Sequence, residues 1–208
     1  MIEQIISILA GFIISGISLL GYTGVAAMMA IESACIPLPS EIIMPFSGYL
    51  VSQGRFTLLG ITLAGSIGSV AGSVAVYWVG IWIGREFLEK YGKYILITRH
   101  DLDIADNFFN KYGNFAVFFS RMLPVVRTFI SLPAGIARMN FYKFTAYTFA
   151  GSLPWCFLLG YAGKKTGDNW EILGAYFHKF DVVIGIMVIL GIVWFIRRHI
   201  KIRKKEEI

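Results

Sequence analysis

The stretch SRMLPVVRTFISLPAG, residues 120–135, decides how this chain is expected to fold. It is apolar enough to leave water, yet it carries Arg121 and Arg127 on either side of Pro124. Proline removes a helical hydrogen-bond donor and disfavours helix in the residue before it. The apolar run 113–138 around this stretch is therefore predicted to form short helical pieces rather than one long helix.

A second interrupted run lies earlier in the chain, at 24–53, where IPLPSE (36–41) breaks the apolar sequence. The pieces on either side of each break hold about 11–14 residues, which as helices reach about 16–21 Å. That length is short of the hydrocarbon core of a bilayer, roughly 30 Å thick. Each run is therefore compatible with a re-entrant hairpin that enters and leaves on one side, or with one broken helix that passes through.

The composition of the whole chain is that of a membrane protein. Its 208 residues are 56% hydrophobic and 15% charged, with a mean hydropathy of +0.66, whereas soluble domains carry about 25% charged residues. Three further apolar runs, 57–83, 141–163 and 181–197, reach the roughly 17–25 residues of a membrane-spanning helix, and the run 5–21 either spans or lies tilted at the interface. We therefore expect an all-α polytopic membrane protein of a single domain, 1–208, in the plasma or inner membrane.

Positive charge helps to choose between the two topologies. The C-terminal stretch RRHIKIRKKEEI (197–208) holds six basic residues, which predicts a cytoplasmic end after a final helix at 181–200. With this end inside, re-entrant hairpins put a strong excess of Lys and Arg on the cytoplasmic side, whereas pass-through helices split them almost evenly. Because basic residues concentrate inside, the hairpins are favoured. The segment 85–111 is then predicted to be an amphipathic linker on the cytoplasmic surface.

The two halves of the chain resemble each other in order and spacing. The matches are Gly24 with Gly113, Glu32 with Arg121, Pro45 with Pro133, Gly48 with Gly135, GRFT (54–57) with MNFY (139–142), AGS (64–66) with AGS (150–152), and GR (84–85) with GK (163–164). Each half, about 22–84 and about 112–164, is predicted to hold one hairpin and one spanning helix, with opposite orientation in the membrane. Such inverted repeats are typical of secondary transporters, whose substrate site lies between broken helices near the midplane.

Four charged residues are expected at membrane depth: Glu32, Glu41, Arg121 and Arg127. An uncompensated charge costs about 2.5–3.5 kcal/mol at a helix centre, so we expect these side chains to face one another or a polar cavity. A guanidinium stays charged and offers a planar fork of donors that matches a phosphate. A helix that starts at Pro124 would add free N–H groups, which predicts a phosphate seat. The alternative is that the arginines pair with the glutamates and lock the hairpins together, or that such pairs open for the ligand.

The two glutamates have different interpretations. Glu41 follows Ser40, a good N-cap residue, so Glu41 is either a first-turn residue favoured by the helix dipole or a functional group. Glu32 precedes the break and has no capping role, which favours a functional one. Both are candidates for proton coupling, because a substrate phosphate and Glu32 would compete for Arg121.

Three stretches resemble the DedA family of bacterial inner-membrane proteins (SNARE-associated, VTT-domain) over about residues 20–165: ESACIPLPSE (32–41), SGYL (47–50) and FFSRMLPVVRTFISLPAGIARMNFYKF (118–144). Members of that family resemble transporters that recycle polyprenyl phosphate or other phospholipid carriers, and several are linked to the proton gradient. The resemblance implies a flippase that returns undecaprenyl phosphate to the cytoplasmic leaflet, with phosphatidylethanolamine as an alternative lipid. An acidic position that is often Asp in the family's first hairpin would be Glu41 here, or absent.

The candidate substrate-binding residues are Arg121, Arg127, Glu32, Glu41, Ser40, Pro124 and Gly135. The sequence has no recognisable nucleophile–base constellation, metal-ligand spacing or phosphate loop, so no enzyme activity, metal or cofactor is expected. Cys35 and Cys156 fit no metal-ligand spacing and are expected to be two buried free thiols.

The predicted partners are the anionic polyprenyl phosphate lipid and membrane lipids, not nucleic acid, and a homo-oligomer is left open. Two other classes of function are also left open. A proton-coupled exporter of small cations or drugs would need Glu32 but tolerate Arg121→Ala. A membrane scaffold would tolerate apolar replacement of all four charged residues.

Overall fold

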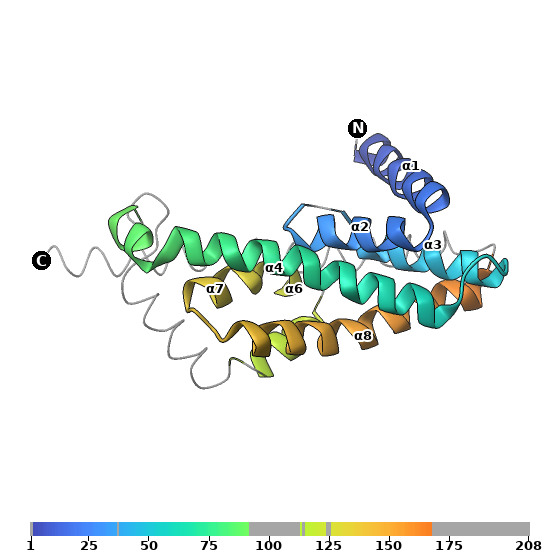
Figure 1. Ribbon diagram of the computed structural model, residues 1–208. Helices are drawn as coiled ribbons and strands as arrows, with labels where there is room; N and C mark the ends of the chain where they lie inside the picture. Colours follow the sequence, from blue (N-terminus) through green and yellow to red (C-terminus); the bar gives the residue numbers. More distant parts are fainter. Residues whose placement is uncertain (1, 37, 92–112, 114, 124–125, 168–208) are drawn as a thin grey trace, which may run out of the picture.

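The computed structural model describes residues 2–36, 38–91, 113, 115–123 and 126–167, and all regular structure in these ranges is helical (Figure 1). The helices are α1 (Ile2–Leu20), α2 (Tyr22–Ser33), α3 (Ser40–Ser52), α4 (Leu58–Tyr91), α6 (Val126–Phe129), α7 (Ser131–Ile136) and α8 (Phe141–Thr166), with a further helical segment at 115–120. The all-α prediction is thus confirmed for the described residues. The predicted final helix at 181–200, the basic tail, the linker from residue 92 onward and Pro124 lie outside them.

Both interrupted runs are split into short helices, as their prolines predict. The first run forms α2 and α3, of 12 and 13 residues. Pro39 occupies the N-cap of α3, a position from which the helix needs no N–H donor. The second run forms the segment 115–120, then a turn at 121–123, and then α6 and α7. Neither run therefore forms one continuous helix.

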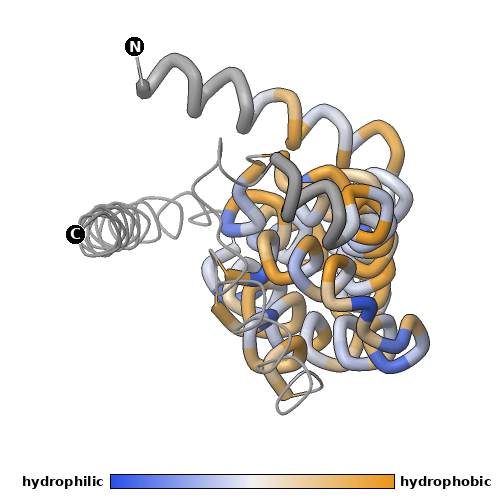
Figure 2. The backbone as a smooth tube through the Cα atoms, turned by 90° about the vertical axis from the view of Figure 1, so that its left-hand side faces the viewer, coloured by the Kyte–Doolittle hydropathy of each residue, from blue (hydrophilic) through white to orange (hydrophobic). Residues whose placement is uncertain are grey.

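Two long helices form the frame on which these short ones pack. α4 contains a non-helical residue, Gly84, with φ 59° and ψ 166°, which separates Leu58–Gly84 from the rest of the helix. Leu58–Gly84 has 27 residues and, within the described ranges, is the one helix both long and apolar enough to cross a bilayer. α8 has 26 residues, about 39 Å at 1.5 Å per residue. Apolar segments predominate along the described helices, and hydrophilic segments are short (Figure 2).

α4 and α8 run antiparallel to each other (Figure 1). Ile61, near the start of α4, lies against Gly160 in the last third of α8, whereas Gly65, one turn further along α4, lies against Cys156. Residue numbers at the contacts thus increase along α4 while they decrease along α8. The two helices consequently begin at opposite ends of the molecule.

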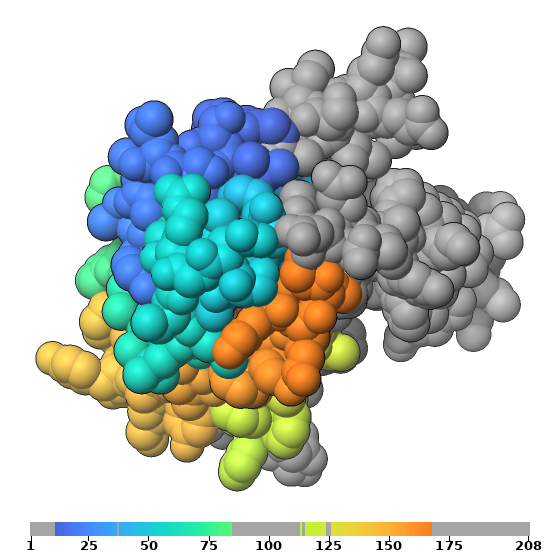
Figure 3. Space-filling view, turned by 90° about the vertical axis from the view of Figure 1, so that its right-hand side faces the viewer, coloured from blue at the N-terminus to red at the C-terminus, as the bar shows by residue number. Residues whose placement is uncertain are grey.

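The two short helices of the first run, α2 and α3, pack on different long helices. α2 packs parallel to α4, because Ala26 meets Gly68 and Ala30 meets Gly72. α3 packs along α8, and the cyan helix lies directly beside the orange end of α8 in Figure 3. The turn between α2 and α3 therefore falls near the middle of α4, and both outer ends of the pair lie at the end of the molecule where α4 begins (Figure 1).

The short helices of the second run also pack on different long helices, but here the first segment packs on α8 and the last one on α4. The segment 115–120 packs on its own long helix, where Phe118 meets Gly151 of α8. α7 packs on α4, where Gly135 lies against the backbone of Tyr77 and against Gly80. The Tyr77 hydroxyl also donates a hydrogen bond to the carbonyl of Met139, just after α7.

Two hydrophobic clusters lie at different heights along α4 and α8. The larger joins α1, α2 and α3 to the start of α4, through Ile61, and to the second half of α8. The smaller consists of Tyr77, Val117, Ala134 and Phe144. Between them, each long helix carries buried hydroxyls. These are Ser66, Ser69 and Ser73 on α4, and Thr148 and Ser152 on α8. A polar layer therefore crosses the middle of the bundle.

Candidate functional site

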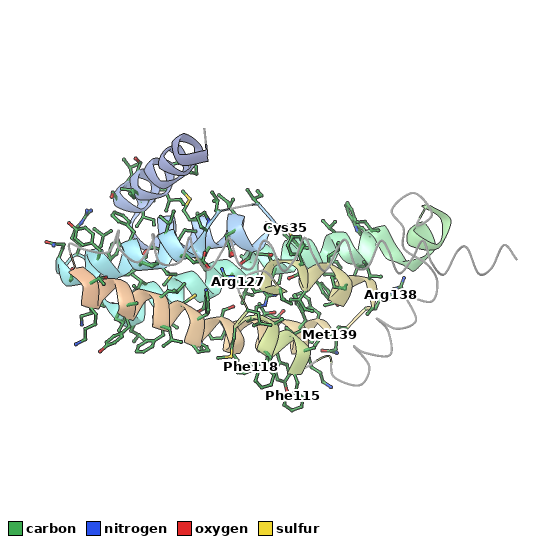
Figure 4. All side chains as sticks on the ribbon, turned by 180° about the vertical axis from the view of Figure 1, so that it is seen from behind. Cys35, Phe115, Phe118, Arg127, Arg138 and Met139 are labelled. Carbon is green, nitrogen blue, oxygen red and sulfur yellow. The ribbon has the colours of Figure 1, made fainter. Side chains whose placement is uncertain are left out.

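A buried ion pair joins the two sets of short helices in this polar layer. Glu32, in the last turn of α2, is 5% exposed, and Arg127 of α6 is 4% exposed. Arg127 Nε donates to Glu32 Oε1 over 3.0 Å, and Nη2 lies 2.5 Å from Oε2 in ion-pair contact. Figure 4 places Arg127 in the interior of the molecule, in contrast to Arg138 near one end. Both charges are thus withdrawn from the surface and compensated by each other.

Neighbouring groups hold this pair in place. Ser33 donates its hydroxyl to Glu32 Oε2 over 3.2 Å, and the Arg127 guanidinium lies 5.7 Å from the ring centroid of Trp155 on α8, within the range of a cation–π contact. The buried carboxylate of Glu41, in the first turn of α3, lies within electrostatic reach of Arg127. Arg127 is therefore surrounded by negative charge and an aromatic face.

Arg121 has a different environment. Its Nη1 donates to Ser73 Oγ over 2.8 Å, and its Nη2 donates to Ser131 Oγ over 3.0 Å and to Thr148 Oγ1 over 3.4 Å. The three hydroxyls come from α4, α7 and α8, and Arg121 is only 2% exposed. Among the described residues, its hydrogen-bond partners are all neutral. We call Ser73, Ser131 and Thr148 the hydroxyl cage.

The predicted pairing of the charged residues is only partly what the structure contains. The sequence predicts that Glu32 competes with phosphate for Arg121, but the arginine that it binds is Arg127. The physical reason is position: Arg121 directly follows the segment 115–120 and turns toward α4 and α8, whereas Arg127 on α6 faces the end of α2. The two arginines therefore have separate hydrogen-bond partners in this conformation, although Arg121 also lies within electrostatic reach of Arg127 and Glu32.

The other predicted site residues have varied positions. Ser40 is the first residue of α3 rather than its N-cap, which is Pro39, and its Oγ is buried without a hydrogen-bond partner among the described residues. Gly135 lies where α7 touches α4, a close helix contact away from the ion pair. Pro124 is outside the described residues.

The expectation of two buried thiols is wrong for one cysteine. Cys156 is buried, but Cys35 is exposed, with a left-handed φ of 65° in the turn after α2. The turn brings its Sγ to the carbonyl of Thr128, at 3.3 Å, so the first break touches α6 directly. An apolar sequence around a cysteine does not bury it when the chain turns at that residue.

Sequence reasoning missed the residues that bind the arginines. Ser66, Ser69 and Ser73 are spaced i, i+3 and i+7 and so share one face of α4, a periodicity that could have revealed a polar face on an otherwise apolar helix. No comparable signal marks Ser131 or Trp155. The described residues contain no group of three or more His, Cys, Asp or Glu side chains that could hold a metal ion.

Comparison with known proteins gives the family of the chain. The model of the VTT domain matches residues 38–165. The uncharacterized membrane protein YkoX of Bacillus subtilis is 45% identical over 170 residues, covering 82% of this chain and 75% of that protein. The undecaprenyl phosphate transporter A of the same organism is 39% identical over 197 residues, covering 93% and 96%.

A third relative, the alkaline phosphatase-like protein of Lactococcus lactis subsp. lactis, is 37% identical over 188 residues, covering 86% of this chain and 88% of that protein. No solved structure matches the chain. The VTT-domain match contains α3, α4, α6, α7 and most of α8, with both arginines and Glu41. On these grounds the chain belongs to the VTT-domain, or DedA, family of membrane proteins.

Proposed function

We propose that this protein is a transporter that carries undecaprenyl phosphate, a lipid phosphate carrier, to the cytoplasmic leaflet of the plasma membrane. The observation that carries the proposal is a pair of buried guanidiniums halfway along the long helices. Ser73, which binds Arg121, stands 15 positions after Leu58 and 11 before Gly84, about 22 Å and about 16 Å from the two ends. The relative named undecaprenyl phosphate transporter A, which aligns over nearly the whole chain, supports the same cargo.

The chemistry of the site suits a phosphate headgroup. Each guanidinium keeps its charge at any physiological pH and presents donors in a plane that two phosphate oxygens can match. A buried charge near the middle of a membrane is costly and is usually retained for function. In the proposed cycle, the phosphate binds Arg121 and replaces Glu32 at Arg127, while the polyprenyl tail stays in lipid.

Proton coupling follows from the ion pair as a second part of the proposal. Protonation of Glu32 would remove the charge that holds Arg127 and leave its donors available for phosphate. Glu41, within electrostatic reach of the same arginine, would act in the same sense. The test is transport by Glu32→Gln, which is expected to lose its dependence on an imposed proton gradient. Unchanged gradient dependence in that variant would contradict this part.

We also propose that the chain is one membrane domain of two inverted repeats, at about 22–84 and about 112–164, each made of a re-entrant hairpin and a spanning helix. The antiparallel packing of α4 and α8 supports this topology, because pass-through helices would make the two long helices parallel. The exchange of partners supports it as well: α2 and the segment 115–120 pack on the long helix of their own half, whereas α3 and α7 pack on that of the other.

Equivalent positions in the two halves have equivalent contacts, as a two-fold relation requires. Gly48 of α3 meets the backbone of α8 at Gly160, and its counterpart Gly135 of α7 meets the backbone of α4 at Tyr77. At the offset of 86 that aligns the two AGS motifs, buried Thr62 corresponds to buried Thr148. The same offset aligns the two buried serines 66 and 152. In this arrangement the C-terminus lies in the cytoplasm.

The test of the transport function uses purified protein reconstituted into liposomes that contain undecaprenyl phosphate. An external phosphatase reports the fraction of lipid that reaches the outer leaflet. Protein-containing vesicles are expected to expose nearly the whole pool, and vesicles with Arg127→Gln only the outer-leaflet share. Equal exposure in protein-containing and empty vesicles would overturn the proposal.

The phosphatase-like name of the Lactococcus lactis relative makes hydrolysis the competing candidate. The same vesicles without external enzyme distinguish the two activities. Transport predicts no release of inorganic phosphate, whereas release that depends on the protein would favour hydrolysis.

A further inference from the structure

We propose that the hydroxyl cage of Ser73, Ser131 and Thr148 around Arg121 is the first station of the phosphate headgroup and that it selects a phosphate monoester over a phosphodiester. The inference rests on the proposed function and deepens it, because it assigns an order to the two arginines and a chemical class to the headgroup. It adds three specificity-determining residues that no sequence pattern around the arginines indicates.

The charges of the two arginines are compensated differently, and this difference gives the order in which a phosphate binds them. Arg127 is in contact with the carboxylate of Glu32, so an anion can bind it only by displacing that carboxylate. Arg121 is held by neutral hydroxyls, and an anion can add to it without breaking an ion pair. Displacing a carboxylate from a buried pair is strongly unfavourable, because it separates two charges that compensate each other. An arriving phosphate therefore binds Arg121 before Arg127.

The hydroxyls of the cage surround one guanidinium and can act as donors as well as acceptors. A hydroxyl that accepts a hydrogen bond from a guanidinium still has its own proton to donate. Each of the three hydroxyls accepts from Arg121 and is at least nine-tenths buried. Together with the guanidinium, they can present several O–H and N–H donors to one oxyanion.

Two polar atoms beside the cage lack a hydrogen-bond partner among the described residues. They are Nε of Arg121 and Oγ of Ser69, which stands one helical turn before Ser73 on the same face of α4. Buried polar atoms are nearly always paired, and exceptions often mark a place for water, an ion or a ligand. Arg121 Nε can only donate and the Ser69 hydroxyl can donate, so an anion can accept from both, whereas a cation cannot pair with Nε.

The number of hydrogen-bond donors at the hydroxyl cage gives the selectivity for a phosphate monoester over a phosphodiester. A phosphate monoester has three terminal oxygens, whereas a phosphodiester such as the headgroup of phosphatidylglycerol has two. Since the cage hydroxyls come from three separate helices, a third terminal oxygen can be reached from a direction that the other two do not use. A site built to hydrogen-bond a group discriminates against analogues that lack it, because its buried polar atoms are then left unpaired.

The experiment measures equilibrium binding to the purified full-length protein in detergent micelles, with undecaprenyl phosphate as the monoester and phosphatidylglycerol as the diester. Ser73→Ala, Ser131→Ala and Thr148→Val each remove one hydroxyl, and each is expected to weaken monoester binding about tenfold or more. Diester binding is expected to change less, so selectivity falls. Thr148→Ser keeps the hydroxyl and is expected to bind like the wild type.

Ser47→Ala is the matched control. Ser47 is also buried, but its hydroxyl donates to the Ile43 carbonyl of its own helix, α3, so its removal is expected to leave both affinities unchanged. The melting temperature of each variant is measured in parallel. If one cage variant does not fold, the other two and Thr148→Ser still decide the question.

Two results would overturn the inference. Cage variants that lower the melting temperature but bind the monoester with wild-type affinity and selectivity would show a structural role only. Loss of monoester binding in Arg127→Gln, with retention in Arg121→Gln, would reverse the order of the two stations. Either result leaves the proposed transport function standing, whereas a wild-type protein that binds no phosphorylated lipid would contradict both.

Discussion

Arg127 on α6 and Glu32 on α2 form a buried ion pair across 95 positions of sequence. This contact joins the break of the first apolar run to the break of the second. Each partner alone would be an uncompensated charge in a layer enclosed by hydrophobic clusters. The pair therefore compensates both charges and links the two breaks to each other.

Removing one member of this pair is expected to destabilise the protein. Glu32→Gln leaves the Arg127 charge buried without a counter-charge in contact, and the expected loss in the free energy of unfolding is about 3–5 kcal/mol. Denaturation of the purified protein in mixed micelles measures it. The double variant Glu32→Met with Arg127→Met is expected to recover most of the loss, because an apolar pair leaves no charge to compensate. Additive losses in the double variant would contradict a direct interaction between the two side chains.

Replacing Arg121 is expected to have opposite effects on stability and on transport. Arg121→Met removes a charge whose hydrogen-bond partners are neutral hydroxyls, and these hydroxyls can turn to carbonyls of their own helices. The melting temperature is therefore expected to stay level or rise, while transport of undecaprenyl phosphate is lost. Arg127→Met is the matched comparison and is expected to lower both. A clear fall in the melting temperature of Arg121→Met would mean that its role is mainly structural.

Close helix contacts predict equal costs at two corresponding glycines. A methyl group at Gly48 would overlap the backbone of Gly160, and one at Gly135 would overlap the backbone of Tyr77. Gly48→Ala and Gly135→Ala are each expected to lower the free energy of unfolding by about 1–3 kcal/mol. Gly11→Ala, a helical position with open space around it, is the control and is expected to be neutral or slightly stabilising. Markedly unequal losses would count against the two-fold relation of the halves.

The proposed topology predicts the sides on which two exposed turns lie. Gln53, before α4, is expected outside the cell, and Asn140, before α8, inside. Single cysteines at these positions, in a background with Cys35→Ser and Cys156→Ser, are treated on intact cells with a membrane-impermeant maleimide. Labelling is expected at position 53 only. Protection of both positions would favour helices that pass through the membrane instead of re-entrant hairpins.

The breaks in the helices could be predicted because their cause is local. Pro39 restricts its own φ and the residue before it regardless of what the rest of the chain does, and α3 begins directly after it. The long helix Leu58–Gly84 follows from the length and apolarity of one continuous run. Burial of Arg121, Arg127 and Glu32 also followed from the sequence, since each lies in a segment too apolar to remain in water.

The partners of the charged residues could not be predicted, because they depend on the packing of helices that are far apart in the sequence. Two glutamates and two arginines allow several pairings of equal chemical merit, and only the crossing of α2 with α6 brings Glu32 to Arg127. The exposure of Cys35 likewise depends on a turn with a left-handed φ, not on the apolar residues around it.

Within the described residues, the sequence by itself thus determined which apolar runs form helices, where prolines interrupt them and which charges leave water, since these depend on neighbouring residues and on hydrophobicity. The tertiary structure alone decided that Arg127 is neutralised by a carboxylate while Arg121 rests among three hydroxyls from α4, α7 and α8. The reason is that hydrogen bonds and ion pairs act over about 3 Å. Their partners are chosen by how the helices pack, and only packing gives one arginine a counter-charge and leaves the other available to an anion.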